Sequence, residues 1–324
     1  MTGSRNTPLI LAIPSKGRLK EQVEAWLADA GLPLSSAAGG RGYTAAIPAL
    51  PKVEVRLLSA SDIAAALDSG EIHLGVTGED LLREQVADLD SRVMLLRALG
   101  FGKADLIVAV PRGWLDVETM ADLEEVAHAH LVRTGKRLRV ATKYLVQTRA
   151  FFARCGVADY RIVESGGATE GAPASGAAEI IVDITTTGAT LAANHLKIVG
   201  DGVIQKSQAQ LAASLSADWD AEKLAVVRQL LGVVEARARA RGSMMLVWPA
   251  EADAAARSAL AGLVTRGARP RANGLLIAER DMLEAQALLA TAGIGPVAAS
   301  RPEHMFEPIS DAAEALVTRI GSEN

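Results

Sequence analysis

The stretch that decides the fold is Ile180-Ile-Val-Asp-Ile-Thr-Thr-Thr-Gly-Ala-Thr-Leu191. Its apolar beginning predicts a buried strand that ends at Asp183, and the hydroxyl- and glycine-rich residues that follow predict a turn into a helix. Free amides at a helix start can bind a phosphate when a glycine, here Gly188, lets the backbone approach closely. An ordinary strand–turn–helix with a threonine N-cap is the alternative. The loop by itself does not decide between the two.

The rest of the first 215 residues repeats this alternation of strand and helix. The apolar run Leu9–Ile13 is followed by Pro-Ser-Lys-Gly-Arg, which predicts a strand, a loop and then a helix from about Leu19. Helical stretches such as Asp62–Leu67 and Thr148–Arg154 separate further short apolar runs. Those runs predict strands at Val53–Leu58, Leu74–Val76, Leu106–Val110, Arg139–Ala141 and Ile180–Ile184. The alternation predicts α/β layers.

Beyond residue 215 the pattern changes. Ala221–Arg241 has apolar residues at helical spacing and then rows of Ala and Arg, with a stop at Gly242, so we expect a long connecting helix. A short alternation of strand and helix follows, which predicts a small α+β module of ferredoxin-like type. Its strands are expected at Ser243–Trp248, Gly274–Ala278 and Pro296–Ala298, and its helices at Glu251–Thr265 and Met282–Ala292.

Composition excludes several classes of function. The chain has 324 residues, which predicts two or three domains, and it is 49% apolar and 22% charged, as globular proteins are. Aromatic residues are 3% and the net charge is −4, so nucleic acid is not expected as a partner. The single cysteine, Cys155, excludes an internal disulfide, and no CxxC or HExxH spacing suggests zinc. Because Pro14 and Lys16 interrupt the first apolar run, we expect neither a signal peptide nor a membrane span, and a cytoplasmic protein.

Five segments in order make the chain resemble one family, the ATP phosphoribosyltransferases, over about residues 9–215. The loop after Asp183 resembles the family's loop for phosphoribosyl pyrophosphate (PRPP). The other four are similar to its first loop, its G-V-T-G-x-D turn, its A-T-x-Y segment and the segment before the PRPP loop: Pro14-Ser-Lys-Gly-Arg-Leu19, Gly75-Val-Thr-Gly-Glu-Asp80, Ala141-Thr-Lys-Tyr144 and Gly167-Ala-Thr-Glu-Gly-Ala-Pro173. Ala64 and Leu145 stand where the family often has proline, which affects local backbone geometry more than charge.

The resemblance implies a fold and a reaction. The catalytic core would have two α/β lobes similar to periplasmic binding proteins, with a cleft between them: lobe I over residues 1–104 with 190–215, and lobe II over residues 105–189. Residues 219–324 would form a separate regulatory and assembly domain. The implied enzyme is a glycosyltransferase of histidine biosynthesis that joins PRPP to N1 of ATP. Mg²⁺ on the pyrophosphate is the expected cofactor.

The resemblance also implies site residues. Lys16 and Arg18 flank a glycine after a strand, where cations meet phosphates, although a solvated pair of loop charges is the alternative. Asp183 would receive the ribose hydroxyls, and Glu170 would contact ribose or magnesium. These four are the expected catalytic residues. PRPP binding is expected at Asp183, Thr185, Thr186, Thr187, Gly188, Ala189 and Thr190. ATP binding is expected at Arg18, Thr77, Gly78 and Asp80, with a purely structural turn as the alternative for the last three.

The expected partners are the small molecules ATP and PRPP, further copies of the chain in a homo-oligomer, and L-histidine as a feedback inhibitor. Two other kinds of function stay open at this point. A bilobed ligand-binding sensor without catalysis shares the fold, and fold does not fix function. A non-catalytic regulatory partner of a phosphoribosyltransferase is the third possibility, but such a partner has no reason to keep a PRPP loop.

Overall fold

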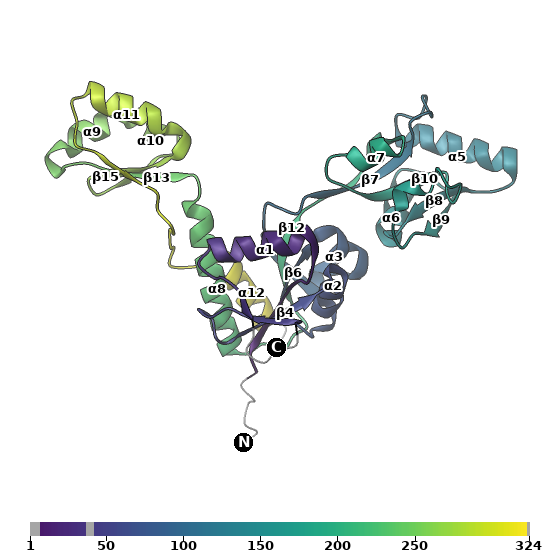
Figure 1. The fold of residues 1–324 in the computed structure, drawn as a ribbon, viewed down its shortest axis with the longest axis horizontal. Helices are drawn as coiled ribbons and strands as arrows, with labels where there is room; N and C mark the ends of the chain where they lie inside the picture. The colour runs from purple at the N-terminus through teal and green to yellow at the C-terminus, as the bar shows by residue number, and fades with distance from the viewer. Residues whose placement is uncertain (1–6, 37–41, 323–324) are drawn as a thin grey trace, which may run out of the picture.

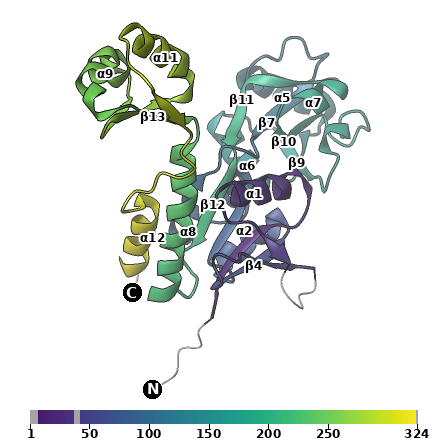
Figure 2. The same ribbon diagram turned by 60° about the vertical axis from the view of Figure 1, so that its left-hand side comes forward.

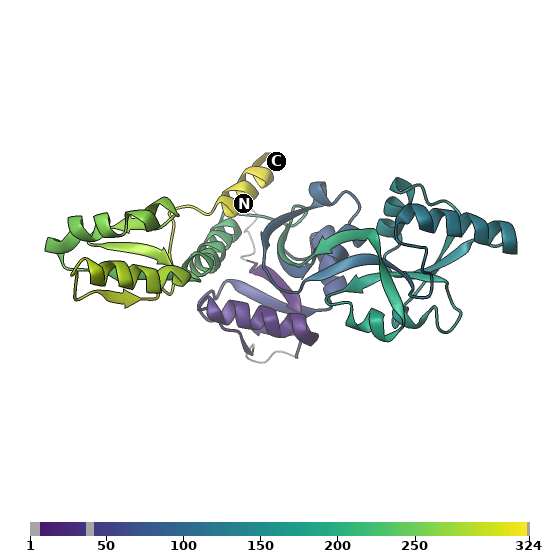
Figure 3. The same ribbon diagram turned by 90° about the horizontal axis from the view of Figure 1, so that it is seen from above.

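The computed structural model describes residues 7–36 and 42–322. Their strands form three sheets, of seven, five and four strands. Figures 1 and 3 show these sheets in three bodies arranged in a row, with the N-terminal body in the middle. We call this middle body lobe I, the five-stranded body lobe II, and the four-stranded body the small domain. The predicted α/β core with a small additional α+β domain is confirmed.

Lobe I is a three-layer sandwich around the sheet β2-β3-β4-β1-β5-β12-β6. Its centre is parallel, with β1 (Leu9–Pro14) between β4 (Val53–Leu58) and β5 (Leu74–Gly78). The remaining strands are β2 (Ser35–Ser36), β3 (Thr44–Ala46), β6 (Val93–Ala98) and β12 (Ala209–Ser214). One face packs on α2 (Ala60–Ser69), α3 (Glu79–Gln85) and α4 (Leu89–Arg92), and the other packs on α1 (Gly17–Asp29).

Lobe II is built on the sheet β11-β7-β10-β8-β9. Side chains of its central strands alternate between two apolar clusters: Leu106, Val108 and Val110 face α5 and α6, whereas Ile107 and Ala109 face η1 and α7. The strands are β7 (Ala104–Pro111), β8 (Leu138–Thr142), β9 (Tyr160–Glu164), β10 (Ile180–Thr185) and β11 (Leu196–Ser207). The helices are α5 (Met120–Thr134), α6 (Leu145–Arg154), η1 (Thr169–Gly171) and α7 (Ala189–Ala193).

The chain passes between the lobes twice, between β6 and β7 and again between β11 and β12. The prediction that residues 190–215 belong to lobe I is therefore wrong for the residues before β12. β11 pairs antiparallel with β7, so residues 196–207 complete the sheet of lobe II, and α7 packs against that same strand. Only β12 returns to lobe I, where it lies between β5 and β6.

The long C-terminal helix is part of lobe I. α8 (Ala221–Ala240) matches the predicted helix, but its apolar side, including Val227, Leu230 and Val234, joins the same cluster as α1 and the lobe I sheet. The last helix, α12 (Asp311–Ser322), lies beside α8 and adds Leu316 to this cluster (Figure 2). The prediction of one separate module over 219–324 is therefore wrong. Burial of these apolar faces removes them from water, and only the segment between the two helices stands apart.

The small domain has the predicted ferredoxin-like topology. Its sheet runs β14-β15-β13-β16, every pair is antiparallel, and α9, α10 and α11 complete a βαββαβ order. Its elements are β13 (Ser243–Val247), η2 (Ala250–Ala252), α9 (Asp253–Ala259), α10 (Ala261–Thr265), β14 (Arg269–Arg271), β15 (Gly274–Ala278), η3 (Glu279–Asp281), α11 (Met282–Thr291) and β16 (Ala298–Ser300). Among the described residues, no helix is long and apolar enough to cross a membrane.

Candidate active site

The predicted phosphate loop joins β10 to α7 at the carboxyl edge of the lobe II sheet. Gly188 has φ +73°, a left-handed conformation that glycine adopts without strain. The Thr185 hydroxyl accepts a hydrogen bond from the Gly188 amide at 3.0 Å, and the Thr187 hydroxyl accepts one from the Ala189 amide at 3.4 Å. Threonine hydroxyls therefore bind the amides of the loop, and a phosphate could take their place at the same amides.

An open cavity of about 320 Å³ lies against this loop. Its walls carry both predicted carboxylates, Asp183 and Glu170, together with the loop itself. The other lining residues are Ile184, Thr185, Thr186, Thr187, Ala189, Thr190 and Leu191. The structure thus brings together the residues of lobe II that the sequence predicts as PRPP ligands, and Gly188 shapes the turn between them.

The Asp183 carboxyl is half-buried at the end of β10. Burial raises its pKa above the ordinary value, while the amide of Ile184, which donates to Oδ1 at 2.8 Å, and the charge of Lys143 lower it. Glu170 acts in the other direction and raises the pKa of Asp183. A partly desolvated carboxylate with this much charge nearby is typical of functional sites.

Lys143 is a residue of this site to which sequence reasoning gives no role, although it lies in the A-T-x-Y segment. β8 and β10 are parallel, with Ile181 opposite Ala141, so two residues further on Asp183 and Lys143 emerge on the same face at the same edge. The signal in the sequence is a cation directly after a buried strand. Its partner could not be read from the sequence, because strand order decides which strand ends are neighbours.

Glu170 lies in η1, the short turn that follows Ala168 at φ +49°. Within residues 7–36 and 42–322 no group of three His, Cys, Asp or Glu side chains could hold a metal ion by itself. Mg²⁺, however, usually keeps water ligands and is held by one or two carboxylates together with substrate phosphates. Asp183 and Glu170 on one cavity wall fit that kind of site.

The predicted cations of lobe I lie elsewhere. Lys16 precedes α1 and Arg18 is in its first turn, at the carboxyl end of β1, and both are exposed. Among the described residues neither side chain has an ion-pair or hydrogen-bond partner, and no side chain caps the amino end of α1. Two unpaired cations beside an uncapped helix start can bind phosphate oxygens. The structure brings them together with each other, and among the described residues no contact joins them to the predicted phosphate loop.

For the predicted nucleotide residues Thr77 and Asp80 the structure favours the structural alternative. Thr77 is fully buried, and its hydroxyl donates to the Ala60 carbonyl at 2.8 Å. The Asp80 carboxylate is buried and accepts from the hydroxyls of Tyr144 and Ser207. Gly78 has its own constraint, since a Cβ there would stand 2.3 Å from an Asp80 oxygen. Thr77 is held by a partner within lobe I, whereas Asp80 lies where the two lobes meet and takes its partners from lobe II.

Comparison with known proteins agrees with this geometry. The family model for ATP phosphoribosyltransferase matches residues 59–234. The ATP phosphoribosyltransferase of Caulobacter vibrioides (strain NA1000) is 66% identical over 319 residues, covering 97% of this chain and 100% of the relative. That of Afipia carboxidovorans is 58% identical over 234 residues, 72% of each chain. A solved structure, the ATP phosphoribosyl transferase (HisG:HisZ) complex from Thermotoga maritima, is 25% identical with a TM-score of 0.53, covering 70% of this chain and 98% of that chain.

These matches extend well beyond the predicted phosphate loop. The family model covers the end of lobe I, all of lobe II and most of α8, and the Caulobacter relative is matched over its whole length. The relatives bear the name of an enzyme, so a sensor without catalysis is not favoured. The chain belongs to the ATP phosphoribosyltransferase family.

Proposed function

We propose that this chain transfers the 5-phosphoribosyl group of PRPP to N1 of ATP, giving phosphoribosyl-ATP and pyrophosphate, the first step of histidine biosynthesis. The observation that carries this proposal is the loop of threonines at Gly188, which lines an open cavity together with two carboxylates in a chain of this family. Both substrates are intracellular metabolites, so we also propose that the protein works in the cytoplasm.

The chemistry needs positioning and charge more than proton transfer. N1 of adenine has a free lone pair, so attack on C1 of the ribose requires no strong general base beforehand. As the C1–O bond to pyrophosphate breaks, positive charge grows on the ribose and negative charge on the leaving group. Asp183 would hold the ribose hydroxyls and stabilise the positive charge. The loop amides, the threonine hydroxyls and Lys143 would hold phosphate oxygens.

Magnesium would be held by the pyrophosphate of PRPP together with Asp183 or Glu170, and it would neutralise charge on the leaving group. The protein itself orients the ribose: the Asp183 carboxyl is fixed by the Ile184 amide, and burial keeps much of the surrounding water away from it. The proposed ATP side is lobe I, where Lys16 and Arg18 would grip triphosphate oxygens and bring the adenine toward C1.

The direct test is to incubate the purified chain with ATP, PRPP and magnesium and to follow the ultraviolet absorbance of the adenine ring. We expect a change in absorbance that requires both substrates, with pyrophosphate released in equal amount. No change under any substrate combination would contradict the proposal.

Replacing Arg18 with alanine tests the ATP side. We expect turnover to fall by more than about tenfold, because a charge-assisted contact to phosphate is worth roughly 1.5–3 kcal/mol. Lysine at this position should restore only part of the activity, since it cannot bind in a bidentate way. Steady-state kinetics measure the effect. Lys20→Ala, which removes a partly exposed cation paired with Glu24 on the same helix, is the control. Kinetics of Arg18→Ala equal to those of the control would make Arg18 an ordinary solvated charge.

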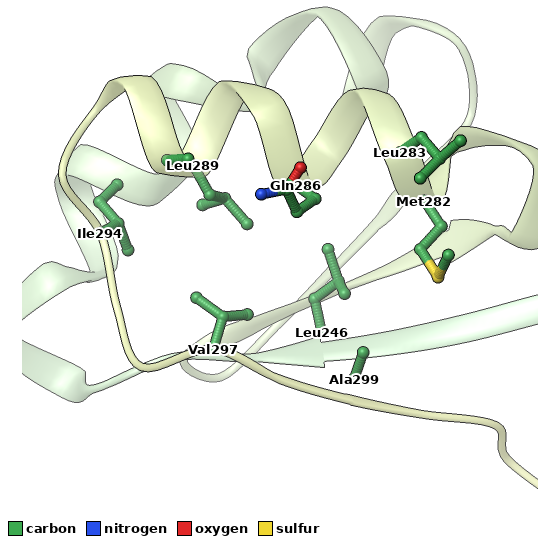
Figure 4. Close-up of a pocket in the computed structure, with 9 residues that line it drawn as sticks. Leu246, Met282, Leu283, Gln286, Leu289, Ile294, Val297 and Ala299 are labelled. Carbon is green, nitrogen blue, oxygen red and sulfur yellow. The ribbon is translucent and has the colours of Figure 1, made fainter.

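We further propose that the small domain assembles copies of the chain into a homo-oligomer and that it transmits feedback inhibition by L-histidine. An inhibitor acts this way only if it binds one arrangement of the lobes better than another. A groove of about 340 Å³ lies between α11 and the strands of this domain. Figure 4 shows the residues that line it. Its lining is apolar apart from Gln286, which suits the side chains of a partner better than a zwitterionic amino acid. We therefore do not assign histidine to this groove.

Removing residues 243–300 tests these roles without damage to lobe I. Met245 pairs with Ser300 across β13 and β16, so the two cut ends lie close together and a short Gly-Ser linker can join them. We expect a folded chain with a smaller particle and no response to millimolar histidine, measured by light scattering and by activity assays. The contrasting truncation after residue 217 removes α8 and α12 from the lobe I core and should not fold. An unchanged particle size would contradict assembly, and an intact protein that ignores histidine would contradict feedback.

A further inference from the structure

The two lobes are joined by a thin connection. Where the two chain crossings run side by side, Leu99 donates its amide hydrogen to the Ala209 carbonyl at 3.0 Å, and Ala209 donates to the Phe101 carbonyl at 3.0 Å. Gly100 and Gly102 lie in this connection with φ +77° and +62°. Two short crossings of this kind permit one lobe to rotate against the other. Side-chain contacts between the lobes therefore decide which angle is favoured.

The first such contact is a buried polar network at Asp80 on α3 of lobe I. Its Oδ2 accepts from the Tyr144 hydroxyl at 2.6 Å, and its Oδ1 accepts from the Ser207 hydroxyl at 2.8 Å. Both partners belong to lobe II. Tyr144 is 1% exposed, Ser207 4% and Asp80 5%, so a lost partner would leave a buried polar group unpaired.

The second contact joins two helices. α6 of lobe II has no capping side chain of its own at Tyr144, and Glu84 of lobe I supplies the cap instead. One Glu84 oxygen accepts from the Val146 amide at 2.8 Å and the other from the Gln147 amide at 3.1 Å. A carboxylate at a helix start satisfies free amides and the positive end of the helix dipole. The cap exists only while the two lobes keep this angle.

These contacts lead directly to the PRPP site. Tyr144 follows Lys143 in the chain, and the Lys143 Nζ stands 5.2 Å from the centroid of the Tyr144 ring. Lys143 in turn lies close enough to Asp183 to affect its ionisation. Because Glu84 holds the amides at the start of α6, loss of this cap would free that segment and, with it, the neighbouring Lys143 beside Asp183.

We propose that Glu84 and Tyr144 are positioning residues, which couple the angle between the lobes to the placement of Lys143 at the ribose-phosphate site. Neither needs to touch a substrate. The coupling rests on the proposed function, because the site that it organises is the PRPP site. It predicts that breaking the cap weakens PRPP binding in lobe II, although Glu84 belongs to lobe I.

The test uses Glu84→Ala in the full chain, with Arg83→Ala as the matched control, since Arg83 is exposed on the same helix and pairs within it with Glu79. Two readouts are needed. Spin labels at the exposed positions Glu21 in lobe I and Val132 in lobe II, in a Cys155→Ser background, report the distribution of interlobe distances. Steady-state kinetics report KM for PRPP and for ATP separately.

We expect Glu84→Ala to broaden the distance distribution and to raise KM for PRPP by about 5- to 20-fold, within the usual range of coupling between sites, with a smaller change for ATP. Glu84→Gln, which keeps one acceptor oxygen, should lie between the alanine variant and the parent, and it carries the test should the alanine variant not fold. Tyr144→Phe should give the same shift in KM for PRPP.

Two results would overturn the coupling: distances and KM values equal to those of Arg83→Ala, or a lower melting temperature with unchanged kinetics, which is the mark of a merely structural cap. Failure of the proposed function is a different observation. It would appear as no PRPP-dependent product from the parent chain, whatever the distance distributions of the variants.

Discussion

Gly188→Val is expected to weaken PRPP binding by at least about 100-fold, as the sum of a strained backbone and lost phosphate contacts, each worth roughly 1–3 kcal/mol. Gly188 has φ +73°, where a β-branched residue is strained. Apart from its two chain neighbours, no described residue has an atom within 4 Å of a Cβ built there, so the added side chain would point into open space, where a phosphate must approach the loop. Isothermal titration calorimetry with PRPP measures the loss, and ATP binding should change far less.

The control for this substitution is Gly135→Val. Gly135 has φ +67° at the end of α5 in the same lobe, and it too has open space around its Cβ. Valine at position 135 therefore introduces a similar backbone strain, but outside the loop at Gly188. Unchanged PRPP affinity in Gly188→Val would remove the loop from the site, and an equal loss in both variants would attribute the effect to general strain in lobe II.

Asp183→Asn is expected to lower kcat/KM for PRPP by about 10²- to 10⁴-fold, because two hydrogen bonds from ribose hydroxyls to a charged acceptor are worth roughly 1.5–3 kcal/mol each. The amide keeps the shape of the side chain but removes the negative charge that faces the growing positive charge on the ribose. Glu170→Gln, on the same cavity wall, is the comparison and should lose less. Kinetics at saturating ATP measure both variants. A loss below about tenfold in Asp183→Asn would give the aspartate a capping role.

The pH profile of the parent chain adds a second measurement of the same residue. Burial raises the pKa of Asp183 above that of an ordinary aspartate. In the proposed mechanism the ionised form is the active one, so kcat/KM should decline as the pH falls toward this raised pKa, at a higher pH than an exposed aspartate would cause. The acidic limb should be missing from the residual activity of Asp183→Asn.

Local patterns in the sequence determined most of the secondary structure of this protein and the order of its elements. The apolar run into Asp183 and the threonines around Gly188 predict a strand, a turn and a helix start, and β10, the loop and α7 follow in that order. The strand–helix alternation after residue 242 predicts the small domain, because strand and helix periods appear within a few residues. The predicted residues of the candidate site in lobe II line one cavity for the same reason: one continuous segment supplies most of its lining.

Tertiary structure alone decided the rest. The Ala- and Arg-rich α8 resembles a spacer in sequence, but its apolar side packs into the core of lobe I. α12, from the far end of the chain, packs into the same core. β11 belongs to lobe II because it pairs with β7, and pairing between distant strands leaves no local signal. Asp80 resembles a ligand in its motif and becomes a buried acceptor because Tyr144 and Ser207 meet it from the other lobe. In each case the deciding partner lies far away in sequence, and only the packed chain brings it into contact.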